Sequence, residues 1–540
     1  MSNFSKGLLA GLSLVVVTLV GLPVASPLPS AVPAADASRI TDEALTRSQL
    51  MDTLGYLTDE IGPRLTNSPN FRRAAAWTRD RFAAWGLQNA HLEPWGPFGR
   101  GWSVTRFSAE MIAPQEMPLI AMPKAWSPAA GQLTADAVLL EATTTAELEK
   151  YRGHLAHRIV LVGRPRPLAP RFAPLATRYS ADDLAAFASD RPFPPNNENF
   201  APPPSAGELA RRRFEAERLQ FLADEHVSLI VEPSGGGFDG GTIAVQAASV
   251  PQPADTPRAE RVYAWNPRAR TVPQVVVATE HYNRMARLLA RGDAVRLAVD
   301  LEVQFDDSNL MSSQTLADVP GSDLADQIVM VGAHLDSWHA GTGATDNAAG
   351  VAVVMETARL FEALRLRPRR TVRFALWGGE ETGGGARPYV EAHIARLPKE
   401  PEASAGRSSS PGQFVKLPDY DKYTAYFNID AGTGKVRGVY LAGNAALKPI
   451  FRSWLEPFAR LGASTLTMNG DWGSDFEWFD RVGVPIVSFI QDEIEYDTRT
   501  HHTNMDVLDR IQPDDLKQAA AIMTTFVYEA AMRDQGLPRK

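Results

Sequence analysis

The chain of 540 residues contains no cysteine. This absence excludes disulfide bonds, thiolate metal sites and a cysteine nucleophile, so any bound metal must be held by histidine and carboxylate side chains. Histidine is also scarce, with 10 residues in the whole chain. The search for a metal site is therefore confined to a few segments.

The chain also lacks an excess of positive charge. Its 55 lysines and arginines stand against 63 aspartates and glutamates, which gives a formal net charge of -8. A long basic run, which would typically contact the phosphates of a nucleic acid, does not occur. Nucleic acid is therefore not expected as a partner. A chain of this length is typical of an enzyme with more than one structural unit.

Apolar runs long enough to cross a membrane are missing after the N-terminal region. There, Lys6 precedes an apolar stretch over residues 8–22, and Ala35-Asp36-Ala37 offers a cleavage site of small residues. This pattern predicts a signal peptide over residues 1–37 and a periplasmic or secreted product. The alternative is that the segment is retained as an N-terminal membrane anchor.

The remaining sequence divides into three parts. Over residues 301–540, buried strands alternate with helices, which predicts an α/β fold with a mixed, mostly parallel sheet sandwiched by helices. Residues 38–125 begin with helical periodicity and are expected to be the first part of the same catalytic domain. Residues 126–300 are rich in proline and arginine, and they are expected to form an inserted, β-rich domain.

Candidate metal ligands gather beside the predicted strands. The residues in these positions are His334, Asp336, Asp346, Glu380, Glu381, Asp430, His501 and His502, whereas the nearby His339 is expected to be a hydrogen-bonded structural residue. Open α/β sheets place their sites at the carboxyl ends of strands, where the loops converge on a crevice. Imidazole and carboxylate groups suit zinc, and one aspartate can bridge two ions roughly 3.5 to 4 Å apart. In the pair Glu380-Glu381, one side chain can turn to the metal while the other serves as general base.

Five segments carry a resemblance to a known family. GAHLDS, ATDNAAGVA, WGGEE, NIDAG and THHTNMD occur in the order typical of the di-zinc exopeptidases, which include bacterial leucine aminopeptidases, carboxypeptidase Q and glutamate carboxypeptidase. The resemblance covers residues 40–85 and 301–540. It implies two zinc ions per chain, held by His334, Asp346, Glu381, Asp430 and His502.

The resemblance also implies roles around these ligands. Glu380 is expected to be the general base. Asp336 is expected to orient the ring of His334 without binding the metal itself. A cis peptide bond is expected after Asp346. The family spacing of a ligand histidine followed four residues later by aspartate selects His502, with Asp506 as its supporting residue.

Two further residues are candidates for contacts with the substrate. His501 occupies a position where some relatives carry a tyrosine, and we expect it to stabilise the oxyanion. Arg499 is a candidate for binding a substrate carboxylate, with an ordinary surface arginine as the alternative. Some relatives carry a protease-associated domain at the place of residues 126–300. Such an insert is expected to restrict the crevice to short peptides.

The sequence therefore predicts a zinc-dependent exopeptidase that acts on short peptides. Attack by zinc-bound hydroxide with Glu380 as base is the expected mechanism, in an aminopeptidase or a carboxypeptidase Q-like dipeptidase. A single-zinc, glutaminyl-cyclase-like acyltransferase and a non-catalytic receptor of the same fold are the alternatives. A homo-oligomer is compatible with the sequence. The sequence does not indicate which side chains the enzyme prefers in its substrates.

Overall fold

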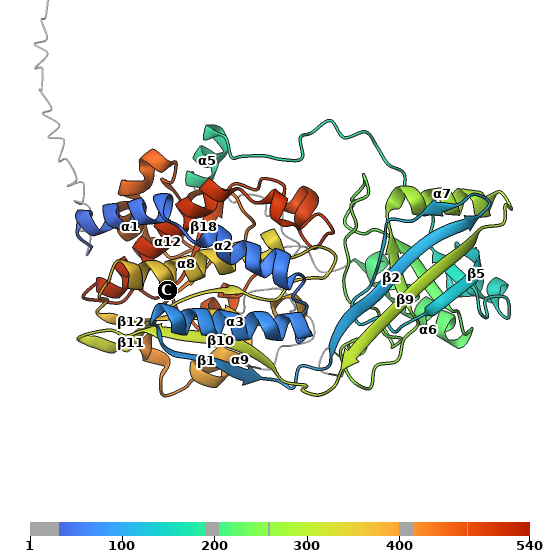
Figure 1. Ribbon diagram of the computed structural model, residues 1–540, viewed down its shortest axis with the longest axis horizontal. Coiled ribbons are helices and arrows are strands. Elements are labelled where there is room, and N and C mark those ends of the chain that lie inside the picture. The colour runs from blue at the N-terminus through green and yellow to red at the C-terminus, as the bar shows by residue number, and fades with distance from the viewer. Residues whose placement is uncertain (1–31, 190–204, 258–259, 399–413, 472) are drawn as a thin grey trace, which may run out of the picture.

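The computed structural model describes residues 32–189, 205–257, 260–398, 414–471 and 473–540, so the apolar run of the predicted signal peptide lies outside it. The chain forms two lobes that lie side by side (Figure 1). Each lobe is built on an eight-stranded sheet.

The first lobe contains the predicted α/β sheet. In spatial order its strands are β1 (Gln88–Trp95), β10 (Ser312–Val319), β12 (Arg370–Trp377), β11 (Leu324–His334), β15 (Tyr423–Asn428), β18 (Ile486–Gln491), β16 (Val436–Tyr440) and β17 (Thr465–Thr467). The central strands β12, β11, β15 and β18 pair in parallel, whereas β1 and β10 pair antiparallel at one edge. The predicted mixed, mostly parallel sheet is confirmed.

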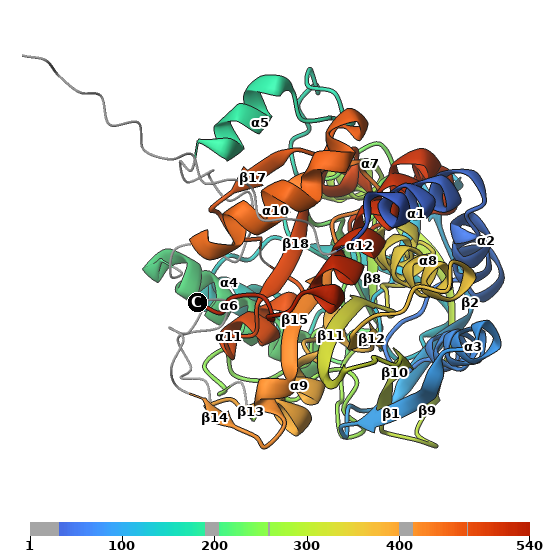
Figure 2. The same ribbon diagram turned by 90° about the vertical axis from the view of Figure 1, so that its left-hand side faces the viewer.

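Helices cover both faces of this sheet (Figure 2). One face packs against α1 (Ala34–Thr46), α2 (Leu50–Gly55), α3 (Pro69–Trp85), α8 (Ala349–Ala363), α10 (Lys448–Leu455) and α12 (Pro513–Met532). The other face packs against α9 (Arg387–His393) and α11 (Phe476–Arg481). The sequence of α8 is apolar on nearly all sides because the helix is enclosed between the sheet and its neighbour α12.

The second lobe is the insert. Its strands, in spatial order, are β3 (Met117–Pro118), β2 (Gly101–Ala113), β9 (Arg296–Asp306), β5 (Gly131–Leu140), β6 (Ile159–Val162), β7 (Leu229–Pro233), β8 (Gln274–Val277) and β4 (Ala121–Pro123). Helices α4 (Thr145–Leu148), α6 (Ala206–Asp224) and α7 (Thr279–Ala290) flank this sheet. The sheet begins before the predicted boundary at residue 126, because β2 pairs with β9 from Gly101 to Ala113.

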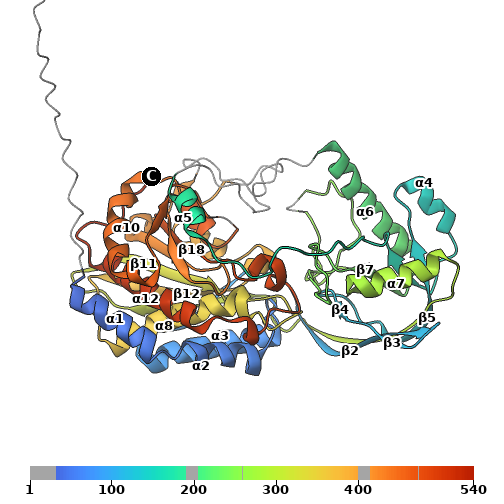
Figure 3. The same cartoon turned by 90° about the horizontal axis from the view of Figure 1, so that it is seen from above.

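Several contacts join the lobes. A buried apolar cluster brings Leu65 and Trp338 of the first lobe against Trp102 and Trp126 of the insert. The short helix α5 (Ala181–Ala188) belongs to the insert by sequence, yet it packs on β17 of the first lobe (Figure 3). The insert therefore contacts the first lobe at more than one place.

The N-terminal boundary of the folded part differs from the expectation. Helix α1 begins at Ala34 and packs on α12, and Ala37 within this helix is buried. Cleavage after residue 37 would divide this helix. No helix within the described ranges is both long and apolar enough to cross a membrane.

Candidate metal centre

Three predicted ligands form a first group at the end of β11. His334 is the last residue of this strand and is 1% exposed. Its Nε2 lies 3.2 Å from Oδ1 of Asp346 and 3.2 Å from Oδ1 of Asp430. The ligand atoms of these three residues are close enough together to hold one metal ion.

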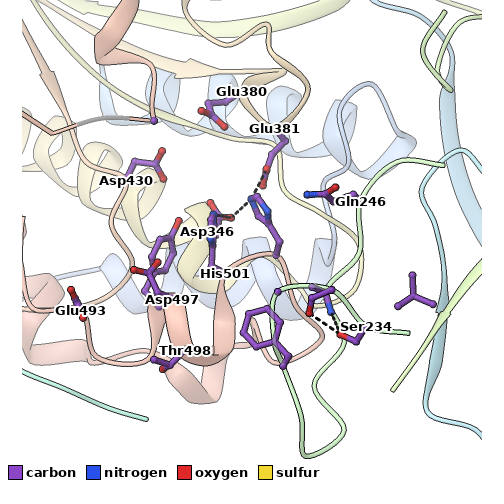
Figure 4. A pocket seen from close by; sticks show the side chains of 18 of the residues that line it. Ser234, Gln246, Asp346, Glu380, Glu381, Asp430, Glu493, Asp497, Thr498 and His501 are labelled. Carbon is purple, nitrogen blue, oxygen red and sulfur yellow. Dashed lines mark hydrogen bonds and ion pairs between the residues drawn. The ribbon is translucent and has the colours of Figure 1, made fainter. Parts of the chain in front are cut away.

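A second group shares Asp346 with the first. Nε2 of His502 lies 3.3 Å from Oδ2 of Asp346 and 3.0 Å from Oε2 of Glu381. The corresponding nitrogen of His501 is 3.9 Å from the same aspartate oxygen. Thus Asp346 directs one oxygen to each group, as a bridging ligand would. Figure 4 shows Asp346 with Asp430 and Glu381 near it. The peptide bond after Asp346 is cis, as expected.

Asp506 and Asp336 support the two groups differently from the expectation. Asp506 accepts hydrogen bonds from the Thr345 amide at 2.5 Å and the Asp346 amide at 3.2 Å, so it fixes the bridging residue. Nδ1 of His334 lies 3.0 Å from the main-chain oxygen of Asp336, but 3.6 Å from its carboxylate. That carboxylate instead accepts from the Glu380 amide at 3.2 Å. Asp336 therefore contacts both the ligand ring and the turn of the predicted base.

The site concentrates negative charge that protein donors do not neutralise. Burial, followed by the charge of Asp346, raises the pKa of Glu381 to about 7, and the same two causes raise the pKa of Asp506 to about 7. Oε1 of Glu381 is buried without a hydrogen bond, and the buried Oδ2 of Asp346 faces the rings of His502 at 3.3 Å and His501 at 3.9 Å. Unpaired buried carboxylate oxygens are costly unless cations offset their charge. The donor set of imidazoles and carboxylates fits zinc.

Glu380 lies in a tight turn directly after β12. Gly379 adopts a φ of 90°, and a Cβ there would lie 2.6 Å from the ring of Trp95, so the turn requires glycine. Burial raises the pKa of Glu380 well above its usual value. The charge of His334 lowers this pKa and that of Asp430 raises it. A carboxyl group with a raised pKa beside a metal site is suited to accept and release a proton.

His501 and Arg499 lie in different surroundings. The ring of His501 stacks on Tyr496 with 4.8 Å between centroids, and His501 lines the crevice next to Asp346. Nη1 of Arg499 lies 3.1 Å from Oε1 of Glu495, and Arg499 is not among the residues that line the crevice. The structure therefore does not bring Arg499 to the site.

The metal centre opens into a crevice of about 1770 Å³ between the lobes. Glu493 and Asp497 line it from the first lobe, whereas Lys124, Arg218 and Glu232 line it from the insert. Figure 4 shows Glu493 and Asp497 on one side of Asp346, and Ser234 and Gln246 of the insert on the other. The crevice can therefore enclose a small ligand between two walls of different charge.

Sequence reasoning missed two buried residues of the site. Arg64 is fully buried and donates to the main-chain oxygens of Leu335 at 2.8 Å and Gly343 at 2.8 Å, which ties together the loops that carry His334 and Asp346. Asp475 is also fully buried, and its Oδ1 accepts from the Ala386 amide at 2.5 Å. The segments LTDEIGPRLTNSPN and GSDFEWF contain these residues. Their partners are main-chain groups distant in sequence, which a local pattern does not reveal.

The chain is similar to known peptidases. Residues 314–527 match the model of peptidase family M28. Carboxypeptidase Q of Mus musculus is 24% identical over 493 residues, which cover 90% of this chain and 87% of that protein.

Solved structures share the fold. The peptidase M28 precursor of Shewanella amazonensis superposes with a TM-score of 0.61 at 24% identity, covering 93% of this chain and 98% of that one. A zinc aminopeptidase from Bacillus subtilis superposes with a TM-score of 0.53 at 16% identity, covering 90% of this chain and 95% of that one. Together with the family match over residues 314–527, these likenesses indicate that the protein is a zinc metallopeptidase similar to those of peptidase family M28.

Proposed function

We propose that this protein is an exported exopeptidase that uses two zinc ions to remove residues from the amino terminus of short peptides. The observation that carries the proposal is a pair of candidate ligand groups that share Asp346 at the base of the crevice, with His334 and Asp430 in one and His501 and His502 in the other. The apolar run over residues 8–22 supports export, because it has the pattern of a signal peptide.

The proposed ligands divide between the two zinc ions. His334 and Asp430 would hold one ion and His502 and Glu381 the other, with Asp346 between them. Bound zinc supplies Lewis acidity, which polarises the scissile carbonyl and lowers the pKa of water.

Other side chains would move protons and stabilise charge. Glu380 takes the proton of the attacking water and delivers it to the leaving amine, since its raised pKa suits both steps. His501 lines the crevice beside the bridging aspartate and donates a hydrogen bond to the oxyanion that develops on the carbonyl.

The charge of the crevice wall supports trimming from the amino end. Glu493 and Asp497 line the wall of the first lobe, where a free ammonium group would find opposite charge. Arg499, the cation suggested for a free carboxylate, is paired with Glu495 instead. The insert wall carries Arg218, which can face the carboxylate at the far end of a short peptide, whereas Lys124 on the same wall is paired with Glu232.

Blocked peptides test the direction of cleavage. A tripeptide, its N-acetylated form and its C-amidated form are digested in parallel, and the products are identified by mass spectrometry. We expect N-acetylation to abolish cleavage and C-amidation to leave the removal of the first residue largely intact. Cleavage of the acetylated but not the amidated peptide would assign a carboxypeptidase instead.

A further inference from the structure

The segment 492–506, which we call the zinc-binding loop, carries several groups of the proposed site. It includes the crevice residues Glu493 and Asp497, the paired histidines His501 and His502, and ends at Asp506. The loop belongs to the first lobe, yet two separate segments of the insert hold it, one near each end.

The first attachment lies at the start of the loop. The amides and carbonyls of Thr177 and Ile494 exchange two hydrogen bonds, both of 2.9 Å. Arg178 places Nη1 2.9 Å from Oδ2 of Asp492, which is fully buried. The Tyr179 amide donates to Oδ1 of the same carboxylate at 3.0 Å. Both oxygens of Asp492 thus accept hydrogen bonds from the insert.

The second attachment lies beside the proposed ligand. The Val245 amide of the insert donates to the main-chain oxygen of His502 at 3.2 Å. The Asn504 amide donates to the Ile243 oxygen at 3.0 Å, and the Ile243 amide donates back to Oδ1 of Asn504 at 2.7 Å. Nδ2 of Asn504 donates to the Gly241 oxygen at 3.2 Å. One side chain therefore joins the loop to two peptide groups of the insert.

The backbone of His502 needs such support. Its φ is 60°, in the left-handed region that residues other than glycine seldom adopt. Conformations of this kind persist where surrounding contacts enforce them. Here, contacts with the insert support this conformation. Val245 of the insert bonds to His502 itself, and Ile243 of the insert bonds to Asn504, two residues later.

We propose that Asn504 is a positioning residue through which the insert fixes the zinc-binding loop and thereby sets the affinity for zinc. The inference rests on the proposed function, since it takes His502 as a zinc ligand. The insert is then part of the metal centre as well as a wall of the crevice. Asn504 acts through His502 and needs no contact of its own with the metal or the substrate.

Zinc affinity of the variant Asn504→Ala tests the proposal. We expect it to bind zinc about 10-fold to 100-fold more weakly than the wild type in competition with a chelator. The matched control is Asn444→Ala, which removes a buried asparagine whose Nδ2 donates to the Pro538 oxygen at 2.7 Å, away from the crevice lining. This control should lose comparable stability and keep wild-type zinc affinity.

The outcomes separate the two proposals. A wild type that binds no zinc would refute the proposed function itself. A wild type that binds two ions, together with an Asn504→Ala variant of unchanged affinity, would refute only the positioning role. Equal weakening in Asn444→Ala would also refute it, because general destabilisation would then explain the loss.

Hydrogen exchange of the wild-type protein gives a test that needs no variant. If contacts with the insert strengthen zinc binding by the loop, zinc binding must strengthen the same contacts by an equal free energy, because coupling between two equilibria is reciprocal. The amides of Ile243 and Val245 should exchange more slowly in the zinc-loaded protein. The Ile230 amide, which donates to the Pro273 oxygen within the insert, should be unaffected. Unchanged exchange at Ile243 and Val245 would overturn the proposal.

Discussion

The ring of His501 stacks on the ring of Tyr496, with centroids 4.8 Å apart and an angle of 28° between the planes. The stack holds His501 at the crevice wall, 3.9 Å from Asp346, while its neighbour His502 is closer to both Asp346 and Glu381. Replacement of His501 by alanine should lower kcat by about 10²-fold, because a hydrogen-bond donor to the oxyanion is lost. Steady-state kinetics with a peptide substrate measures this effect.

Zinc content distinguishes the two histidines. His501→Ala should retain the wild-type amount of zinc by elemental analysis, whereas His502→Ala should lose one ion. Loss of zinc from His501→Ala would mean that this residue is a ligand and that its assigned role is wrong.

Glu380→Gln should reduce kcat by about 10²-fold to 10⁴-fold, because the amide cannot take up the proton of the attacking water. The KM and the zinc content should change little, since Glu380 is not among the proposed ligands. Glu381→Gln serves as the comparison and should lose zinc. A Glu380→Gln enzyme with near-normal kcat would show that another group moves the proton.

Arg64→Met should lower the free energy of unfolding by at least about 3 kcal/mol, measured by urea denaturation. The guanidinium makes five hydrogen bonds to main-chain oxygens, and the variant would leave these buried acceptors unsatisfied. Arg79→Ala is a suitable control, because its ion pair with Asp80 is solvent-exposed and contributes little. Equal effects of the two replacements would contradict the structural role of Arg64.

The stability of the metal-free protein should fall as the pH rises from about 5 to about 8. Burial is the main cause that raises the pKa of Glu381, Asp475 and Asp506 to about 7 in the folded protein. The folded state then retains protons that the unfolded chain, with carboxyl pKa values near about 4, has already released. This contribution to stability is present at low pH and is lost as the pH rises through about 7.

Thermal melting in the presence of a chelator checks the pH dependence. The midpoint should decrease over this range, and added zinc should raise it more at high pH, where zinc no longer competes with protons. A metal-free midpoint that increases with pH would contradict the raised pKa values of these carboxyl groups.

The sequence predicted the first lobe well because its strands are buried on both faces. Strand β12 (Arg370–Trp377), for example, ends in the apolar segment 374–377, which is buried throughout and is typical of a central strand of such a sheet. His334, Asp346, Glu381 and Asp430 were also predictable, because each lies at or shortly after the end of a strand or near the start of a helix. His502 lies in the loop after β18, and the family resemblance implied it.

The contacts between the lobes could not be predicted in the same way. The pairing of β2 with β9 joins segments almost 200 residues apart. The sequence of neither strand indicates which other strand it pairs with. The hydrogen bonds of Asn504 and Arg64 likewise involve main-chain groups, which every residue offers. Arg499 was predicted to bind the substrate because it lies three residues before His502 in the sequence. In the structure it forms an ion pair with Glu495, four residues before it.

The central claim is that two zinc ions share Asp346 at the base of the crevice. Anomalous diffraction at the zinc absorption edge, from crystals of the zinc-loaded protein, tests it most directly. The account predicts two peaks, one beside His334 and Asp430 and the other beside Glu381 and His502. A single peak, peaks elsewhere in the molecule, or a second ion held by His501 in place of His502 would contradict it.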